Sequence, residues 1–221
     1  MSTAAFWQWY EQHAAPHLGL RERSFRQAFQ YLDSLHLTGP VTIVETGCTR
    51  DAGNWGGDGQ STVLFDHYLA SCAPGSYCYS IDIDPEATAQ CKALVSDRVA
   101  VFTADSVLAL REIGRNLAQQ GRTIDLLYLD SFDVDWSHTT PSAVHHLKEL
   151  VSIIAHIRRD TLVMVDDCPP DARLLPNDTG GFGFLSSPQI GGKGRLVAEY
   201  ATQVGATPKF ALYQAAWTNL V

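Results

Sequence analysis

The sequence predicts a doubly wound α/β fold, in which helices cover both faces of a mostly parallel sheet. From Val41 onward, five short runs rich in Val, Ile and Leu alternate with helical patterns of about ten residues or more. Crossovers of that length make successive strands pair in parallel and bury both faces of the sheet. The final stretch, KFALYQAAWTNLV, has the apolar pattern of a closing antiparallel strand pair, which brings the expected sheet to seven strands.

The expected elements follow in a regular order. The strand-like runs are VTIVET, YCYSIDID, VAVFTA, IDLLYLD and TLVMVDD, at residues 41–46, 77–84, 99–104, 124–130 and 161–167. Helical runs are expected at 61–71, 85–95, 105–120, 140–157 and 194–205, with two more before the first strand, at about 4–14 and 22–36. We therefore expect an N-terminal helical extension, 1–38, packed on a single α/β domain, 39–221.

Composition limits the classes of partner. The chain has 221 residues, 45% hydrophobic and 18% charged, which suits one soluble globular domain. A net charge of −8 without a Lys/Arg run argues against nucleic acid and against an anionic membrane surface. The five cysteines form no CxxC pair, which disfavours zinc ribbons and redox dithiols. With no signal peptide pattern and no long apolar stretch, we expect a cytoplasmic protein that binds a small molecule.

Strand ends are where such a sheet binds its ligand. The first strand ends in Glu45, Thr46 and Gly47, and a glycine there lets the backbone approach a ligand closely. No GxGxxG and no GxxxxGK[ST] can be laid over the loop that follows, which disfavours dinucleotide and phosphate-loop sites. Trp55 in this loop either stacks on a ligand or pins the loop. Arg50 is either a substrate clamp or the partner of Asp51.

Acidic residues follow the next two strands. Asp82 and Asp84 lie on the same side of the second strand, and an acid there can accept hydrogen bonds from two ribose hydroxyls. Asp105, after the third strand, can meet an adenine amino group or cap the following helix.

Three more aspartates end the fourth and fifth strands. If these strands are neighbours, Asp130 lies roughly 5 Å from Asp166 and Asp167. Two carboxylates at about 4 Å repel by about 4 kcal/mol at an effective dielectric of about 20. A cation, a raised pKa or a neighbouring Arg or Lys must relieve this repulsion. An oxygen-only triad suits Mg²⁺, Ca²⁺ or Mn²⁺. Lys193 and Arg195, in GGKGR, either meet an anionic substrate, neutralise the aspartates or form a solvated helix start.

The motifs in this order resemble class I S-adenosylmethionine-dependent methyltransferases, a Rossmann-like family, over about residues 40–221. With LDSFD and VDD, the pattern is similar to their metal-dependent O-methyltransferase branch, which includes the catechol, macrocin and cephalosporin-hydroxylase-like groups. One departure is that GCTRD follows Gly47, so the expected close-set glycines are displaced. The resemblance implies cofactor-binding roles for Glu45, Thr46, Gly47, Asp82 (ribose) and Asp105 (adenine), and Mg²⁺ ligands at Asp130, Asp166 and Asp167.

The activity implied is methyl transfer from S-adenosylmethionine to a small hydroxylated molecule, with a divalent cation lowering the pKa of the acceptor hydroxyl. Asp130 belongs to the expected catalytic group, and Asp133 and His138 are candidates for taking the acceptor's proton. His145 and His146 lie in a helical pattern and are expected to be packing or solvent residues.

Alternatives remain open at this point. The chain can bind the cofactor without catalysis, act as an NAD-dependent oxidoreductase, or be a metal-dependent hydrolase that uses the aspartates alone. Residues 168–192 are expected to form a long loop over the mouth of the site. The aromatic start (Phe6, Trp7, Trp9 and Tyr10) packs in the core, or forms a lid or the surface of a homo-oligomer.

Overall fold

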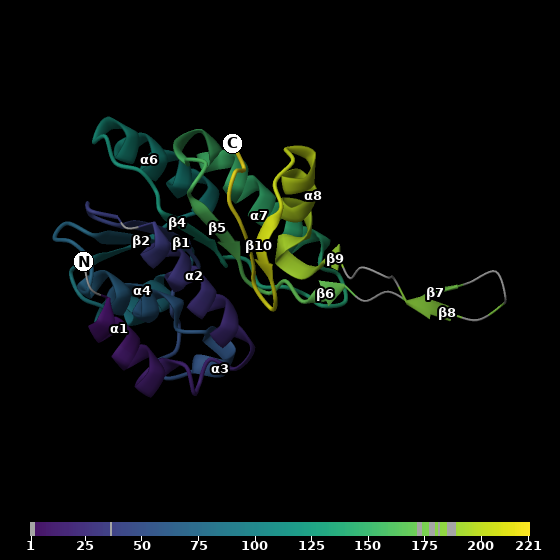
Figure 1. Cartoon of the computed structure of the whole chain (residues 1–221), viewed down its shortest axis with the longest axis horizontal. Coiled ribbons are helices and arrows are strands. Elements are labelled where there is room, and N and C mark those ends of the chain that lie inside the picture. Colours follow the sequence, from purple (N-terminus) through teal and green to yellow (C-terminus); the bar gives the residue numbers. More distant parts are fainter. Residues whose placement is uncertain (1–2, 36, 172–173, 177–179, 181, 185–188) are drawn as a thin grey trace.

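The predicted sheet is present in the computed structural model, which describes residues 3–35, 37–171, 174–176, 180, 182–184 and 189–221. Seven strands lie in the order β10-β11-β5-β4-β1-β2-β3, and Figure 1 shows helices on both sides of them. The first five strands in the chain pair in parallel, and β10 and β11 close the sheet as an antiparallel pair beside β5. The strands are β1 Thr42–Thr46, β2 Tyr77–Asp82, β3 Val99–Thr103, β4 Leu126–Leu129, β5 Leu162–Val165, β10 Pro208–Ala211 and β11 Ala215–Trp217.

The helices also follow the predicted order. One unpredicted element is α3, a single turn at Trp55–Asp58 that Asn54 caps by accepting a hydrogen bond from the amide of Gly57. The longer helices are α1 Ala4–Trp9, which continues as a π-helical turn at Tyr10–Ala14, α2 Glu22–Ser34, α4 Ser61–Ala70, α5 Pro85–Leu94, α6 Ser106–Gln119, α7 Thr140–Ile153 and α8 Arg195–Gln203. Short 3₁₀ turns precede α2 at Gly19–Arg21, follow α7 at Ile154–His156 and precede α8 at Gly192–Gly194.

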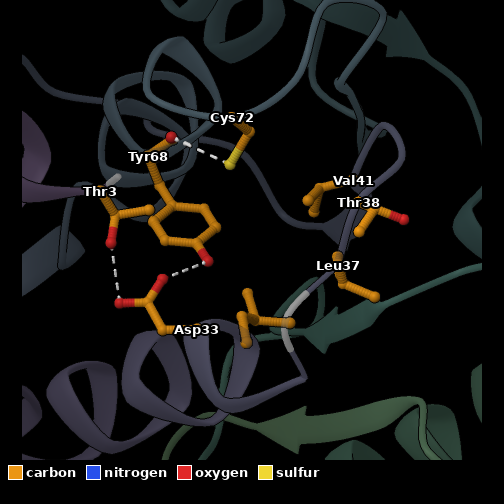
Figure 2. A pocket seen from close by; sticks show the side chains of 8 residues that line it. Thr3, Asp33, Leu37, Thr38, Val41, Tyr68 and Cys72 are labelled. Carbon is orange, nitrogen blue, oxygen red and sulfur yellow. Dashed lines mark hydrogen bonds between the residues drawn. The ribbon is translucent and has the colours of Figure 1, made fainter. Parts of the chain in front are cut away.

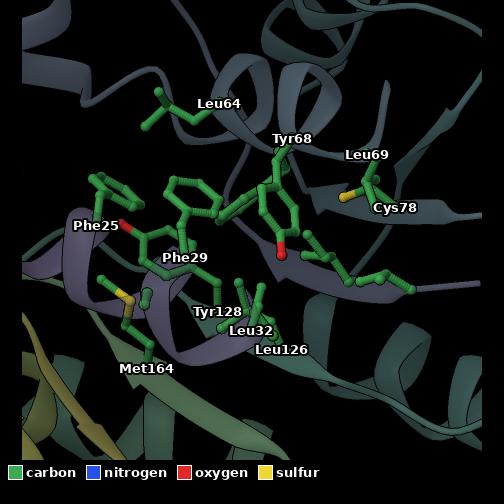
Figure 3. Close-up of a cluster of buried hydrophobic side chains, with 14 of the residues drawn as sticks. Phe25, Phe29, Leu32, Leu64, Tyr68, Leu69, Cys78, Leu126, Tyr128 and Met164 are labelled. Carbon is green, nitrogen blue, oxygen red and sulfur yellow. The ribbon is translucent and has the colours of Figure 1, made fainter. Parts of the chain in front are cut away.

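Two apolar clusters cover the two faces of the sheet. Strand residues alternate between them: Tyr128 belongs to the cluster with α1, α2, α4 and α5, and Leu129 to the cluster with α6, α7 and α8. Figure 3 shows the first cluster, where side chains of α2 and α4 meet those of the strands (Phe25, Phe29, Leu64, Tyr68, Tyr128 and Met164). The doubly wound prediction is therefore confirmed by the core as well as by the strand order.

The N-terminal helices contribute directly to this core. Phe6 and Tyr10 are 2% and 0% exposed, so they take the core-packing fate that is commonest for such residues. Trp7 Nε1 donates a hydrogen bond of 2.7 Å to Asp33 on α2. A domain boundary near residue 38 and a homo-oligomer stay predictions. Among the described residues, no helix is long and apolar enough to span a membrane.

The 168–192 segment is not wholly a loop. β6 Pro170–Asp171 pairs with β9 Gln189–Ile190, and β7 Leu174–Pro176 pairs with β8 Phe182–Phe184. Figure 1 shows the β7–β8 pair extending away from the seven-stranded sheet. The expected cover over the site also involves residues 172–173, 177–179, 181 and 185–188, which lie outside the described residues.

Candidate active site

The strand ends meet at the point where the strand order reverses. β1 lies between β4 and β2, so the loops after these three strands surround one cleft, which is the usual ligand position in a doubly wound sheet. The structure brings three predicted site residues to it, Gly47, Asp82 and Asp130. The full lining among described residues is Gly47, Cys48, Arg50, Asp58, Ser61, Asp82, Asp130 and Ser131.

Gly47 is required at the bottom of this cleft by two features. Its φ is +77°, in the left-handed region, and a Cβ added to it would lie 2.6 Å from the carbonyl oxygen of Asp130. Its amide donates a 2.7 Å hydrogen bond to the carbonyl oxygen of Ile81 at the end of β2. A glycine here therefore lets the backbone after β1 pack directly on the end of β4.

Glu45 and Thr46 support the cleft from behind. Glu45 is fully buried and accepts hydrogen bonds from the hydroxyls of Ser61, Thr62 (2.7 Å) and Ser80 (2.6 Å), which tie the start of α4 to β1 and β2. Burial raises the pKa of Glu45 to about 7. Thr46 Oγ1 is 3.2 Å from Oε2 of Glu149 on α7. Neither side chain lines the cleft, so their expected contact with a cofactor stays a prediction.

The three acids after β2 and β3 have different roles. Asp82 lines the cleft, with Oδ2 accepting from the amide of Cys48 at 3.2 Å and Oδ1 from the amide of Asp84 at 2.9 Å. A carboxylate has about four acceptor positions, so Asp82 can still accept from ligand hydroxyls. Asp84 caps α5, and Asp105 caps α6 by accepting from the amide of Leu108 at 3.0 Å. The capping interpretation of Asp105 is confirmed, and its adenine contact stays a prediction.

The predicted aspartate triad is assembled. β4 and β5 are neighbours, and one carboxylate oxygen from each of Asp130, Asp166 and Asp167 lies within 4.8 Å of the others. Burial and the nearby Asp166 raise the pKa of Asp130 well above its ordinary value. Burial alone would also raise the pKa of Asp166, but the guanidinium of Arg21 and the ammonium of Lys193 hold it below its ordinary value.

Two cations relieve the repulsion in this triad. Arg21 Nε lies 3.1 and 2.9 Å from the two carboxylate oxygens of Asp166, and Nη2 lies 3.2 Å from Oδ1 of Asp167. Lys193 Nζ is 3.0 Å from Oδ2 of Asp167 and bonds Oδ1 of Asp130 directly. Lys193 is 1% exposed, so of the three interpretations that the sequence left open, neutralisation of the aspartates is the one found. All three carboxylates therefore contact a cationic side chain.

The GGKG sequence explains how a lysine reaches this position. Gly192 has a φ of +54°, and a Cβ there would lie 1.9 Å from the carbonyl oxygen of Asp167. A Cβ on Gly194 would lie 2.4 Å from Sγ of Cys168. Between them the amide of Lys193 donates a 3.1 Å hydrogen bond to the same Asp167 carbonyl. Gly192 therefore lets this turn pack against the backbone at the end of β5, and Gly194 leaves room for the side chain of Cys168.

Arg50 and Asp133 form a bridge across the cleft. Arg50, in the loop after β1, lies 3.1 Å from Asp133, in the loop after β4, and 3.4 Å from Asp58. The suggested partner Asp51 is therefore wrong, because Asp58 holds both the backbone amide and the side chain of Arg50. The cavity beneath is about 20 Å³, room for about one water molecule. The pair is exposed, and exposed ion pairs cost only about 0–1 kcal/mol to break.

The other proton-transfer candidate, His138, is exposed in the loop after β4 and is not among the residues that line the cleft. Its backbone amide donates a 2.9 Å hydrogen bond to the carbonyl oxygen of Asp135. Trp55 packs against the core cluster that contains α1 and α4, which agrees with the loop-pinning interpretation. A catalytic role for Asp133 or His138 stays a prediction.

A buried network under the cleft has at its centre a residue that the sequence interpretation missed. Glu149 on α7 is fully buried and accepts hydrogen bonds from Thr46 and, at 2.5 Å, from Ser131, which lines the cleft. His145 Nε2 lies 3.4 Å from Glu149, and His146 is buried with its pKa lowered to about 4 by burial. Burial alone would raise the pKa of Glu149, but the hydrogen bonds and the histidines lower it. The signal in the sequence was the spacing of Ala143, His146, Glu149 and Leu150, which puts Glu149 on the buried face of the helix.

A second pocket lies at the opposite, amino-terminal end of the strands. Its volume is about 130 Å³, and it lies between α2, α4 and Val41. Figure 2 shows Asp33 there, accepting hydrogen bonds from Thr3 and Tyr68. Because this carboxylate also accepts from Trp7, its acceptor capacity is largely used within the protein.

Comparison with known structures identifies the fold. A crystal structure of CalS11, a calicheamicin methyltransferase, matches with a TM-score of 0.52 and 14% identity over 96% of this chain and 84% of that chain. The chain has the fold of class I methyltransferases. The apo structure of CalS11, a TDP-rhamnose 3'-O-methyltransferase, matches this methyltransferase fold with a TM-score of 0.50 and 16% identity over 96% of this chain and 86% of that chain. A protein from Corynebacterium glutamicum gives a TM-score of 0.50 and 14% identity over 99% and 90%.

Other comparisons give weaker similarity or none. Two structures of the MycE methyltransferase match with TM-scores of 0.48 and 0.43, and the chain covers 37% and 31% of their length, about a third. No family model and no curated protein sequence matches the chain. The similarity therefore rests on the fold.

Proposed function

We propose that this protein is an S-adenosylmethionine-dependent methyltransferase that methylates a hydroxyl group of a small molecule. The observation that carries the proposal is the convergence of Gly47, Asp82 and Asp130 on one cleft at the switch point of a methyltransferase fold. The methylation of TDP-rhamnose attributed to CalS11 supports a hydroxylated small molecule as the class of acceptor.

The cofactor supplies a methyl group already activated on a sulfonium. Asp82 is proposed to hold the ribose hydroxyls, and the backbone at Gly47 to pass beneath the methionine end. Asp105, Glu45 and Thr46 complete the proposed cofactor site, the last two by fixing the loop after β1 and the start of α4. These residues mainly position two reactants, which accounts for much of the acceleration in such a displacement.

Asp130 is the proposed general base because it lines the cleft together with Gly47 and Ser131. The acceptor's hydroxyl proton passes to Asp130 while its oxygen forms a bond to the methyl carbon. The carbon–sulfur bond breaks, its electron pair stays on sulfur, and S-adenosylhomocysteine leaves. Asp133 and His138, the two candidates that the sequence suggests for taking this proton, are the alternatives to Asp130.

The proposal is tested by calorimetric titration with S-adenosylmethionine, S-adenosylhomocysteine and NAD⁺. We expect the first two to bind with dissociation constants tighter than about 100 µM and NAD⁺ not to bind in that range. Binding of NAD⁺ alone would indicate an oxidoreductase. Silence from all three would contradict the proposal, and cofactor binding without turnover of any hydroxylated acceptor would favour a cofactor-binding module.

A further inference from the structure

Lys193 holds the place that a divalent cation would take among the aspartates. Its ammonium group bonds Asp130 and lies 3.0 Å from Asp167, and its side chain is 2% exposed. The lysine side chain therefore bridges the carboxylates at the ends of β4 and β5.

Three of the other four carboxylate oxygens of the triad also have partners. Arg21 contacts both oxygens of Asp166 and Oδ1 of Asp167, and Oη of Tyr213 donates a 2.5 Å hydrogen bond to that same Oδ1. Five of the six carboxylate oxygens thus already accept a bond from Arg21, Lys193 or Tyr213. A metal ion bound here would have to displace at least the Lys193 ammonium, because Mg²⁺ needs near-octahedral oxygen ligation.

The backbone is shaped for this arrangement. Asp167 has a φ of +48°, a conformation that few non-glycine residues adopt, and its carbonyl oxygen accepts from the amide of Lys193. Gly192 leaves room for that contact, whereas a side chain at this position would clash with the carbonyl oxygen of Asp167. The turn before α8 therefore packs closely on the end of β5. Lys193 is held there both by its backbone amide and by its ammonium group.

We propose that Lys193 is the resident cation of this site and excludes divalent metal ions from the Asp130–Asp166–Asp167 triad. The sequence predicts Mg²⁺ here, and the geometry points instead to a lysine in its place. The positive charge near the proposed base then comes from the chain itself. This inference concerns cation binding, so it can be tested whether or not the protein transfers methyl groups.

The test is a titration of metal-free protein with Mn²⁺, followed by electron paramagnetic resonance of the free ion and by calorimetry. We expect no stoichiometric binding by the wild type up to about 1 mM Mn²⁺, and at least about tenfold tighter binding by Lys193→Met, in which the carboxylates are released. Lys92→Met, which removes an exposed lysine on α5, is the matched control and is expected to behave as the wild type.

Two further variants keep the test decisive. Lys193→Gln is used as well, since loss of the ammonium can destabilise the fold, and circular dichroism checks the folding of each variant. Stoichiometric Mn²⁺ binding by the wild type that Asp130→Asn abolishes would overturn the inference. So would equal affinity in the wild type and a folded Lys193 variant, or no binding in either. Wild-type binding that Asp130→Asn leaves unchanged would lie outside the triad and agree with the inference.

Discussion

Arg21 and Asp166 are 145 residues apart in the chain, and the Nε atom of Arg21 lies 3.1 and 2.9 Å from the two carboxylate oxygens of Asp166. This pair fastens the segment before α2 to the end of β5. Asp166 is 1% exposed, so its charge has little access to water and depends on the guanidinium. The N-terminal part of the chain thus supplies a positive charge that balances a carboxylate at the end of β5.

Arg21→Ala is expected to lower the free energy of unfolding by about 3–5 kcal/mol, because it leaves a buried carboxylate without its partner. Urea denaturation measures the change. Arg23→Ala, an exposed arginine two residues along, is the control and should stay within about 0.5 kcal/mol of the wild type. Equal effects of the two substitutions would show that the buried pair is not needed for stability.

Gly47→Ala and Gly53→Ala separate backbone strain from steric contact. Both glycines have φ near +80°, but a Cβ would lie 2.6 Å from the Asp130 carbonyl at Gly47 and meets nothing within 4 Å at Gly53. We expect a loss of about 1–2 kcal/mol at Gly53 from the left-handed backbone alone. Gly47→Ala should cost about 1–3 kcal/mol more and also weaken S-adenosylmethionine binding, as shown by denaturation and calorimetry. Similar losses at both positions would contradict the close packing of Gly47 on β4.

Glu45 is expected to make stability fall as pH rises. Its pKa in the folded protein is raised from about 4.5 to about 7, so between these values the unfolded chain releases a proton that the folded chain keeps. The contribution to stability is fully present below about pH 4.5 and lost by about pH 7, a difference of about 3 kcal/mol. Glu45→Gln removes the titration, and the difference between the two stability–pH curves, measured by urea denaturation, isolates it. Parallel curves would show that Glu45 titrates normally.

Asp82→Ala is expected to weaken S-adenosylmethionine binding by at least about tenfold, because charge-assisted hydrogen bonds to the ribose are worth about 1.5–3 kcal/mol. The loss should appear in calorimetry with unfolding little changed. Asp97→Ala removes an exposed aspartate after α5 and should leave affinity unaltered. Unchanged affinity in Asp82→Ala would remove the ribose assignment.

The sheet could be predicted from the sequence because the patterns that define its strands are local. Apolar runs with helices between them define each parallel strand, and the ends of the strands were placed to within one or two residues. The convergence of Asp130 with Asp166 and Asp167 followed from the expectation that consecutive strands are neighbours. The turn of α3 was missed because Trp55–Asp58 contains two glycines, which disfavour a helix.

The partners of the triad could not be found in the same way. Arg21 lies in an ordinary helix start, GLRER, and nothing within that stretch indicates that its guanidinium reaches the end of β5. The sequence indicates Lys193 as a candidate, but only the packing of Gly192 and Gly194 on Asp167 and Cys168 distinguishes a buried lysine from a solvated one. Long-range pairing of side chains depends on the packing of elements, which periodicity does not specify.

The order in which the chain is synthesised matters for the cluster formed by Arg21, Asp130, Asp166, Asp167, Lys193 and Tyr213. Its members span Arg21 to Tyr213, so a growing chain contains all of the carboxylates well before it contains the lysine and tyrosine that complete their contacts. Until then the ends of β4 and β5 carry three acids and a single guanidinium, and they favour hydration over burial. The segment from Lys193 to Tyr213 therefore completes the contacts at the carboxyl edge of the sheet, and a nascent protein acquires them only after that segment has been made.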